Sequence, residues 1–169
     1  MPRLFLDLPM PPEIVIRRES PDQPEVLALL DALDHYLASL YPPEANHILD
    51  AQALRAPDVS FFVAREDGRA VGTGAVRRVA GETATDGVAY GEIKRMMVDP
   101  ERRGRGIGVQ LLGALEAALS EAGIGLALLE TGRDQTGAVH LYERCGYARR
   151  TAFGGYPDNG LSVFYGKRL

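Results

Sequence analysis

Hydrophobic residues recur with two different spacings along this chain, and the change of spacing separates expected strands from expected helices. Residues 13–17 predict a first strand after a Pro-rich N-terminal segment. Pro24 stands where a helix begins, and Pro42 and Pro43 end the helical pattern that follows it. The apolar stripe of that helix consists of Val26, Leu27, Leu29, Leu30, Leu33 and Leu37. A second, short helix is expected over residues 44–54.

The middle of the chain predicts an antiparallel hairpin. Residues 60–65 and 70–77 are its strands, and Asp67-Gly68 supplies the turn. The later elements are expected as a strand over 88–98, a helix over 106–122, a strand over 126–131, a helix over 136–145, and strands near 147–151 and 161–167. A hairpin followed by strand–helix–strand units favours a mixed α/β sheet in a single domain over residues 1–169, with a loose segment over 1–12.

Composition agrees with one globular domain. The 169 residues are 46% hydrophobic and 25% charged, so the core needs neither disulfides nor a structural metal. Cys145 is the single cysteine, and the three histidines have no zinc-ligand spacing, which makes a reducing cytoplasm the expected location and leaves no metal expected. Charges interrupt the apolar stretches within about ten residues, which excludes a membrane-spanning segment. The first residues lack the long uncharged region of a signal peptide.

Charge is distributed unevenly. Residues 1–60 contain four Arg and ten Asp or Glu, a net charge of −6, so the rest of the chain carries +2 of the total of −4. This balance disfavours nucleic acid as a partner. It suggests an anionic small molecule at the second half and a cationic one at the first, although runs of charge are most often solvated faces.

A glycine-rich segment follows the third strand. Asp99-Pro100 turns the chain, and Gly104, Gly106 and Gly108 lead into a helix. Backbone amides at such a helix N-terminus attract phosphate, although a glycine-rich surface turn with solvated arginines is the ordinary alternative. A P-loop is excluded because no Gly-Lys-Ser/Thr follows, and the dinucleotide-binding pattern lacks its third glycine.

Two motifs together resemble a known family. Arg103-Gly-Arg-Gly-Ile-Gly108 matches the Arg/Gln-x-x-Gly-x-Gly/Ala signature of the GNAT superfamily of acyl-CoA-dependent N-acetyltransferases, and Ala138-Val-His-Leu-Tyr-Glu-Arg-Cys-Gly-Tyr147 resembles its later Ala-x-x-Leu-Tyr-x-x-x-Gly-Phe/Tyr motif. One helix and one strand separate them, as in that family. The resemblance covers about residues 13–168. It implies a central mixed sheet of about six to seven strands with a splayed parallel pair, flanked by about four helices.

The resemblance also implies acetyl-CoA as co-substrate. Backbone groups of Met96, Met97 and Val98 would hold the acyl-pantetheine arm. The uninterrupted apolar run at these positions fits a break in the strand's pleat, and a fully buried strand end explains it equally well. Gln135 stands where relatives often have an Asn that contacts pantetheine. The pyrophosphate would be bound by the amides of Arg103, Gly104, Arg105, Gly106, Ile107, Gly108 and Val109.

Two residues are the candidates for proton transfer. By resemblance, Tyr142 is the general acid that protonates the departing thiolate, whereas its spacing alone fits an ordinary helical core face. Glu92 is the candidate base for the incoming amine, because it lies eleven residues before Arg103, as the glutamate does in the histone-modifying branch. An ion pair of Glu92 with Lys94 or Arg77 is the alternative.

Two loops are expected to bind the acceptor. Each contains Tyr-Pro followed by an acidic residue, an arrangement that suits a cation, although such loops are often only turns. The expected acceptor-binding residues are Tyr41, Glu44, His47 and Tyr156. The chain is thus expected to transfer an acetyl group directly to an amine of a small molecule or peptide, and a homodimer is left open. The alternatives are a non-catalytic acyl-CoA sensor or structural protein and an unrelated phosphate-binding module.

Overall fold

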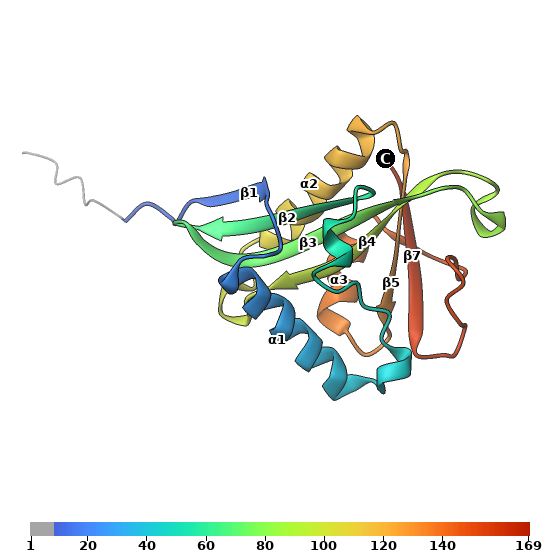
Figure 1. The fold of residues 1–169 in the computed structure, drawn as a ribbon, viewed down its shortest axis with the longest axis horizontal. Coiled ribbons are helices and arrows are strands. Elements are labelled where there is room, and N and C mark those ends of the chain that lie inside the picture. The colour runs from blue at the N-terminus through green and yellow to red at the C-terminus, as the bar shows by residue number, and fades with distance from the viewer. Residues whose placement is uncertain (1–8) are drawn as a thin grey trace, which may run out of the picture.

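A computed structural model gives the fold of residues 9–169, which form one seven-stranded sheet with helices on both faces (Figure 1). The strands follow the order β1-β2-β3-β4-β5-β7-β6 across the sheet. Their bounds are β1 Ile14–Arg18, β2 Val59–Glu66, β3 Arg69–Val79, β4 Tyr90–Val98, β5 Leu126–Gly132, β6 Ala148–Arg150 and β7 Ser162–Arg168. The α-helices are α1 Pro24–Leu40, α2 Ile107–Glu121 and α3 Thr136–Arg144. The expected loose segment over 1–12 lies mostly outside the described residues.

The predicted hairpin is confirmed. β2 and β3 pair antiparallel, and the turn between them has φ values of 47° at Asp67 and 85° at Gly68. Two consecutive left-handed residues give a tight turn whose twist matches that of the flanking strands. β1 adds to the free edge of β2, and β4 pairs with the other edge of β3.

The parallel pair at the centre of the sheet is short. β4 and β5 pair only from Gly91 opposite Ala127 to Ile93 opposite Leu129. Past these three pairs β4 keeps its antiparallel partner β3, and β5 keeps β7. The sheet therefore opens between β4 and β5 in the direction in which both strands end, as the expected splayed pair requires.

Alternating side chains bury the two faces of the sheet separately. Helices α2 and α3 cover one face, and α1 with the loop before β7 covers the other; Figure 1 shows α1, in blue, and α2, in yellow, on either side of the strands. The α2–α3 face is built on Val76, Ile93, Leu112, Leu115, Leu119, Leu129 and Tyr142. The opposite face is built on Val26, Leu30, Phe61, Val63 and Ala75 under α1, and on Tyr90, Leu128, Phe153 and Phe164 under the loop.

The prediction of a helix over residues 44–54 is wrong. The described residues therefore form three α-helices beside the sheet, one fewer than the expected number of about four. Among the described residues this stretch forms only the 3₁₀ turns Pro43–Ala45 and Ala53–Arg55. The Asp50 carboxylate accepts a hydrogen bond of 2.8 Å from the Ala53 amide, so its side chain starts a new turn instead of continuing an earlier one. Asn and Asp favour such local turns over helix interiors. Leu54 still packs under α1, which explains the apolar pattern.

Candidate active site

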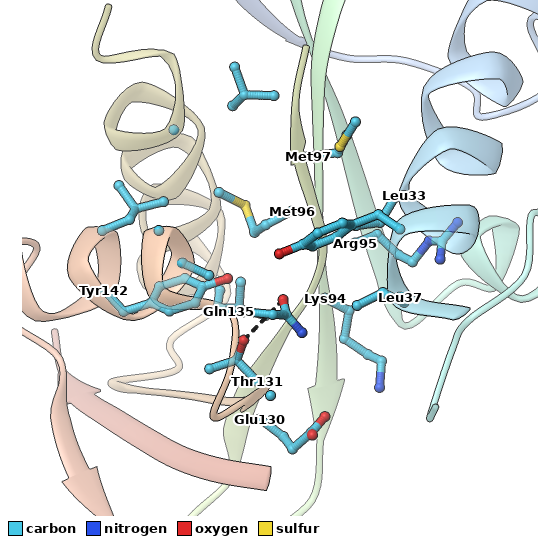
Figure 2. Close-up of a pocket in the computed structure, with 18 of the residues that line it drawn as sticks. Leu33, Leu37, Lys94, Arg95, Met96, Met97, Glu130, Thr131, Gln135 and Tyr142 are labelled. Carbon is cyan, nitrogen blue, oxygen red and sulfur yellow. Dashed lines mark hydrogen bonds between the residues drawn. The ribbon is translucent and has the colours of Figure 1, made fainter. Parts of the chain in front are cut away.

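A cavity of about 570 Å³ lies where β4 and β5 part (Figure 2). Its walls come from the second half of β4, the end of β5, the start of α3, the N-terminus of α2, and α1 with the segment that follows it. Figure 2 shows α3 on one side of the cavity and α1 on the other, with β4 between them. Side chains from both faces of the sheet therefore meet in one space.

A β-bulge shapes the β4 wall. Lys94 stands opposite Ala75 and Met97 opposite Thr73, so β4 has one residue more than β3 between these pairs. Arg95 takes the left-handed conformation, with φ of 56°, and its carbonyl accepts a hydrogen bond of 2.9 Å from the Thr73 hydroxyl. The extra residue interrupts the ladder and turns backbone groups away from β3. The expected break is present, and it begins one residue before the apolar run 96–98, all of which lines the cavity.

The glycine-rich loop forms the far end of the cavity. Gly104 and Gly106 have φ of 77° and 78°, and nothing lies within 4 Å of the position a Cβ would take on either. Across the described part of the chain, the backbone amides of residues 103–109 donate no hydrogen bond. Helix α2 begins at Ile107, so its first free amides join this set. Seven unpaired donors at a helix N-terminus form a site for a large anion.

The arginines of this loop have different hydrogen-bond partners. Arg102 and Arg105 both bind the Glu66 carboxylate, at 2.9 and 2.8 Å, and these contacts lower the pKa of Glu66. Arg105 is not among the residues that line the cavity, and the predicted role of its backbone amide stays a prediction. Arg103 lines the cavity, and its Nε donates to the Val98 carbonyl at 3.3 Å. Among the described residues, Arg102 and Arg105 have carboxylate partners and Arg103 has none.

Tyr142 on α3 belongs both to the core and to the cavity. Its ring packs edge-on against Tyr147 at 5.9 Å between centroids, while Figure 2 shows its hydroxyl directed into the cavity towards Gln135 and Met96. Burial raises the pKa of the Tyr142 hydroxyl, so the group keeps its proton at neutral pH. Gln135 also lines the cavity and accepts a hydrogen bond of 3.3 Å from Thr131 Oγ1.

Glu92 is engaged on both carboxylate oxygens. Arg77 Nη2 lies 3.0 Å from Oε2, and Lys94 Nζ lies 3.3 Å from Oε1. The Tyr156 hydroxyl also hydrogen-bonds Oε1 and accepts a bond of 2.7 Å from Lys94. Burial together with the Glu92 charge raises the pKa of Tyr156. The ion pairing that the sequence left open is therefore present, and the role of Glu92 as a base stays a prediction.

The residues expected to bind the acceptor separate into two groups. Tyr41 and His47 line the cavity; the Tyr41 hydroxyl accepts a hydrogen bond of 3.1 Å from the Asp134 amide, and His47 Nε2 is buried with no partner in the described structure. Tyr156 packs behind the cavity, with its ring 4.9 Å from that of His47. Glu44 is exposed and is not among the lining residues.

Comparison with known proteins assigns this arrangement to a family. The family model described as "Acetyltransferase (GNAT) family" matches residues 26–147. The chain belongs to the GNAT acetyltransferase family. It is 46% identical over 158 residues to the IAA acetyltransferase of Azospirillum brasilense, covering 94% of this chain and 99% of the relative.

Solved structures agree with this acetyltransferase fold. A Klebsiella pneumoniae protein described as an acyl-CoA N-acyltransferase is 36% identical, with a TM-score of 0.72 over 92% of this chain and 97% of that one. The PaiA N-acetyltransferase of Thermoplasma acidophilum, solved in complex with coenzyme A, has a TM-score of 0.70 at 20% identity and covers 93% and 99% of the two chains. No helix of this acetyltransferase, within residues 9–169, is long and apolar enough to cross a membrane.

Sequence reasoning missed a carboxylate of the acetyltransferase cavity. Glu130 lines it from β5, next to Thr131. Its signal in the sequence is a carboxylate that directly follows the apolar residues 126–129 within the strand Leu126–Gly132. The residue lies outside both family motifs, so the resemblance did not draw attention to it.

Proposed function

We propose that this acetyltransferase moves an acetyl group from acetyl-CoA directly to an amine of a small molecule or peptide. The observation that carries the proposal is the opening between β4 and β5, since the cavity there joins the anion-binding loop of residues 103–109 to the side chains under α1. A thioester at the opening is thus accessible from the acceptor side, while its coenzyme portion stays on the side of α2 and α3. No metal is part of this proposal.

The residues present fit the co-substrate. The seven free amides from Arg103 to Val109 and the Arg103 guanidinium bind the pyrophosphate. Backbone groups of Met96, Met97 and Val98 lie beyond the last β4–β5 pair, where β4 has no strand partner on its β5 side, and they orient the acyl-pantetheine arm and polarise its carbonyl. Gln135 extends this binding surface from α3.

Tyr142 is the general acid of the proposed reaction. Its hydroxyl keeps its proton, because burial raises its pKa, and points into the cavity from the coenzyme side. The departing thiolate forms where little water is present, so a positioned O–H donor lowers the barrier.

The acceptor amine enters from the α1 side, beside Tyr41 and His47. An amine with a pKa of about 10.4 is neutral in only about one molecule per thousand at pH 7, so the site must remove a proton before or during attack. Aromatic and carboxylate groups around this end suit a cation. A cytoplasmic location, where one unpaired cysteine is ordinary, completes the proposal.

An amine panel with thiol release as the readout tests the function. The panel contains small primary amines and peptides, and IAA is assayed beside it as a separate acceptor because a 46% identical relative is named an IAA acetyltransferase. Acetyl-CoA-dependent acetylation of at least one amine is the expected result. Coenzyme A binding without transfer to any amine would instead identify a non-catalytic acyl-CoA-binding protein.

A further inference from the structure

Glu130 occupies the point at which the parallel pairing of β4 and β5 ends. The last pair is Ile93 with Leu129, so Lys94 and Glu130 are the first residues of each strand beyond it. Side chains alternate along a strand, and Leu129 belongs to the core under α2 and α3. Glu130 therefore faces the opposite side, the side of α1, from which the acceptor enters.

The Glu130 carboxylate has one oxygen bound and one available. Oε1 accepts a hydrogen bond of 2.7 Å from the Ser162 hydroxyl on β7. Oε2 has no hydrogen-bond partner in the described structure, and Glu130 forms no ion pair there. Figure 2 shows the carboxylate at the cavity edge, on the same side of the opening as the end of the Lys94 side chain.

Glu92 differs from Glu130 in its strand pairing and in the number of partners of its carboxylate. Glu92 is only 2% exposed and lies within the paired part of β4, with both of its oxygens bound by Arg77, Lys94 and Tyr156. Accepting a proton there would break two ion pairs. Glu130 can accept one on Oε2 without losing the Ser162 contact.

We propose that Glu130 binds the ammonium group of the acceptor and takes a proton from it, so that an amine that arrives protonated becomes neutral and attacks the thioester. This inference rests on the proposed function. One ammonium proton passes to Glu130 Oε2 and on to solvent, which frees the nitrogen lone pair to form the new N–C bond. The nitrogen of the tetrahedral intermediate then gives its second proton to Glu130 Oε2. The C–S bond breaks towards sulfur, which receives the Tyr142 proton from the other side of the opening, and solvent then reprotonates Tyr142 and deprotonates Glu130.

Charges around Glu130 tune its basicity. Burial raises the pKa of Glu130 above its ordinary value, which makes it a better base than an exposed carboxylate, while the Ser162 hydrogen bond and the Lys94 charge act in the opposite direction. The titratable groups that face it are Lys94 and Glu92 on β4, His47 and Tyr41 in the segment after α1, Tyr142 on α3, and Tyr156 in the loop before β7. Ser162 offers the one contact that can be removed without changing any charge.

The first variant is Glu130→Gln, whose amide oxygen still accepts from Ser162. For an amine that the wild type acetylates, kcat/KM at pH 7 should fall by about 10²–10⁴, and the loss should shrink at high pH where the amine is already neutral. Acetyl-CoA affinity should be unchanged. Folding raises the pKa of Glu130, so its ionised carboxylate destabilises the native state at pH values above that pKa. The melting temperature of Glu130→Gln at pH 7 should therefore be no lower than that of the wild type.

The second variant, Ser162→Ala, separates catalysis from structure. Removing a hydrogen bond to the charged form raises the pKa of Glu130 further, so the acidic limb of the kcat/KM profile should move to higher pH. The limb should not move when Ser162→Ala is added to Glu130→Gln. A purely structural Glu130 predicts no such shift.

The outcomes distinguish the inference from the function on which it rests. Wild-type turnover with Glu130→Gln equally active overturns the inference alone. An unshifted acidic limb in Ser162→Ala overturns it as well, even if Glu130→Gln fails to fold. Absence of transfer by the wild type to every amine overturns the proposed function and the inference together.

Discussion

The guanidinium of Arg95 in the β4 bulge forms an ion pair with the Asp34 carboxylate on α1. The Arg95 side chain is 4% exposed, and its Nη2 also donates to the Leu30 carbonyl at 3.3 Å. Arg95 has a positive φ of 56°, a backbone conformation that residues other than glycine rarely adopt. Helix α1 thus holds the backbone irregularity of β4 in place beside the cavity.

This relationship predicts different stabilities for two truncations of Arg95. Both Arg95→Gly and Arg95→Ala lose the ion pair, but only glycine adopts the left-handed conformation freely. Arg95→Ala should therefore be less stable than Arg95→Gly by about 1–2 kcal/mol, measured by urea unfolding. Equal stabilities would mean that the φ of 56° is not maintained in the variants.

Replacement of Gly106 tests the anion-binding loop. Asn and Asp both tolerate a positive φ, so Gly106→Asn and Gly106→Asp differ mainly in charge. Saturation of the wild type with acetyl-CoA at 100 times its Kd should add about 2.7 kcal/mol of apparent stability. This thermal shift should largely persist in Gly106→Asn and vanish in Gly106→Asp, where a carboxylate stands against the pyrophosphate. A retained shift in Gly106→Asp would place the coenzyme elsewhere.

Tyr142→Phe removes one oxygen and keeps the ring that packs on Tyr147. Melting temperature and acetyl-CoA affinity should be unchanged, while the rate of the chemical step should fall by about a hundredfold, the lower end for a lost proton donor, since a thiolate is a tolerable leaving group. Acyl donors with more acidic thiols should lose less. Single-turnover kinetics measure this directly, and a wild-type rate with chemistry limiting would refute the general-acid role.

Glu92→Gln should act mainly on stability if the ion-paired arrangement describes its role. Lys94, which is 9% exposed, and Arg77 lose their carboxylate, so the free energy of unfolding should fall by about 1–3 kcal/mol. Adding Lys94→Met should restore part of that loss, because it removes the charge left unpaired. Should Glu92→Gln instead keep its stability and lose turnover that high pH recovers, Glu92 is the base and Glu130 is not.

The sequence predicted those features that depend on local patterns. The stripe from Val26 to Leu37 marks the buried face of α1, and Asp67-Gly68 marks the hairpin turn, because each depends on residues close together in the chain. The glycines before α2 were recognisable because close approach of a ligand to the backbone requires them. Residues 44–54 were mistaken for a helix because apolar spacing does not show that the Asp50 side chain accepts a local hydrogen bond from the Ala53 amide.

The rest of the site depends on contacts between distant segments. Glu92 and Arg77 are cross-strand neighbours in β4 and β3, and Tyr156 reaches them from a loop 64 residues further along the chain. Glu130 lines the cavity because the pairing of β5 with β4 ends one residue before it, and no pattern within the β5 sequence shows where that pairing ends. The bulge at Arg95 likewise depends on Thr73 and Asp34, so the sequence showed a break in β4 but not its exact start.

Because strand pairing joins β4 to β5 over three residue pairs only, the described sheet consists of two leaves, β1–β4 and β5–β7. The leaf of β1–β4 contains the bulge, and the leaf of β5–β7 contains Glu130. A molecule inserted between the leaves can supply backbone hydrogen bonds that the two strands do not give each other beyond Ile93 and Leu129. Release of the product removes these hydrogen bonds, so the interruption of the sheet that forms the cavity also makes the hydrogen bonding across the middle of the sheet depend on what is bound there.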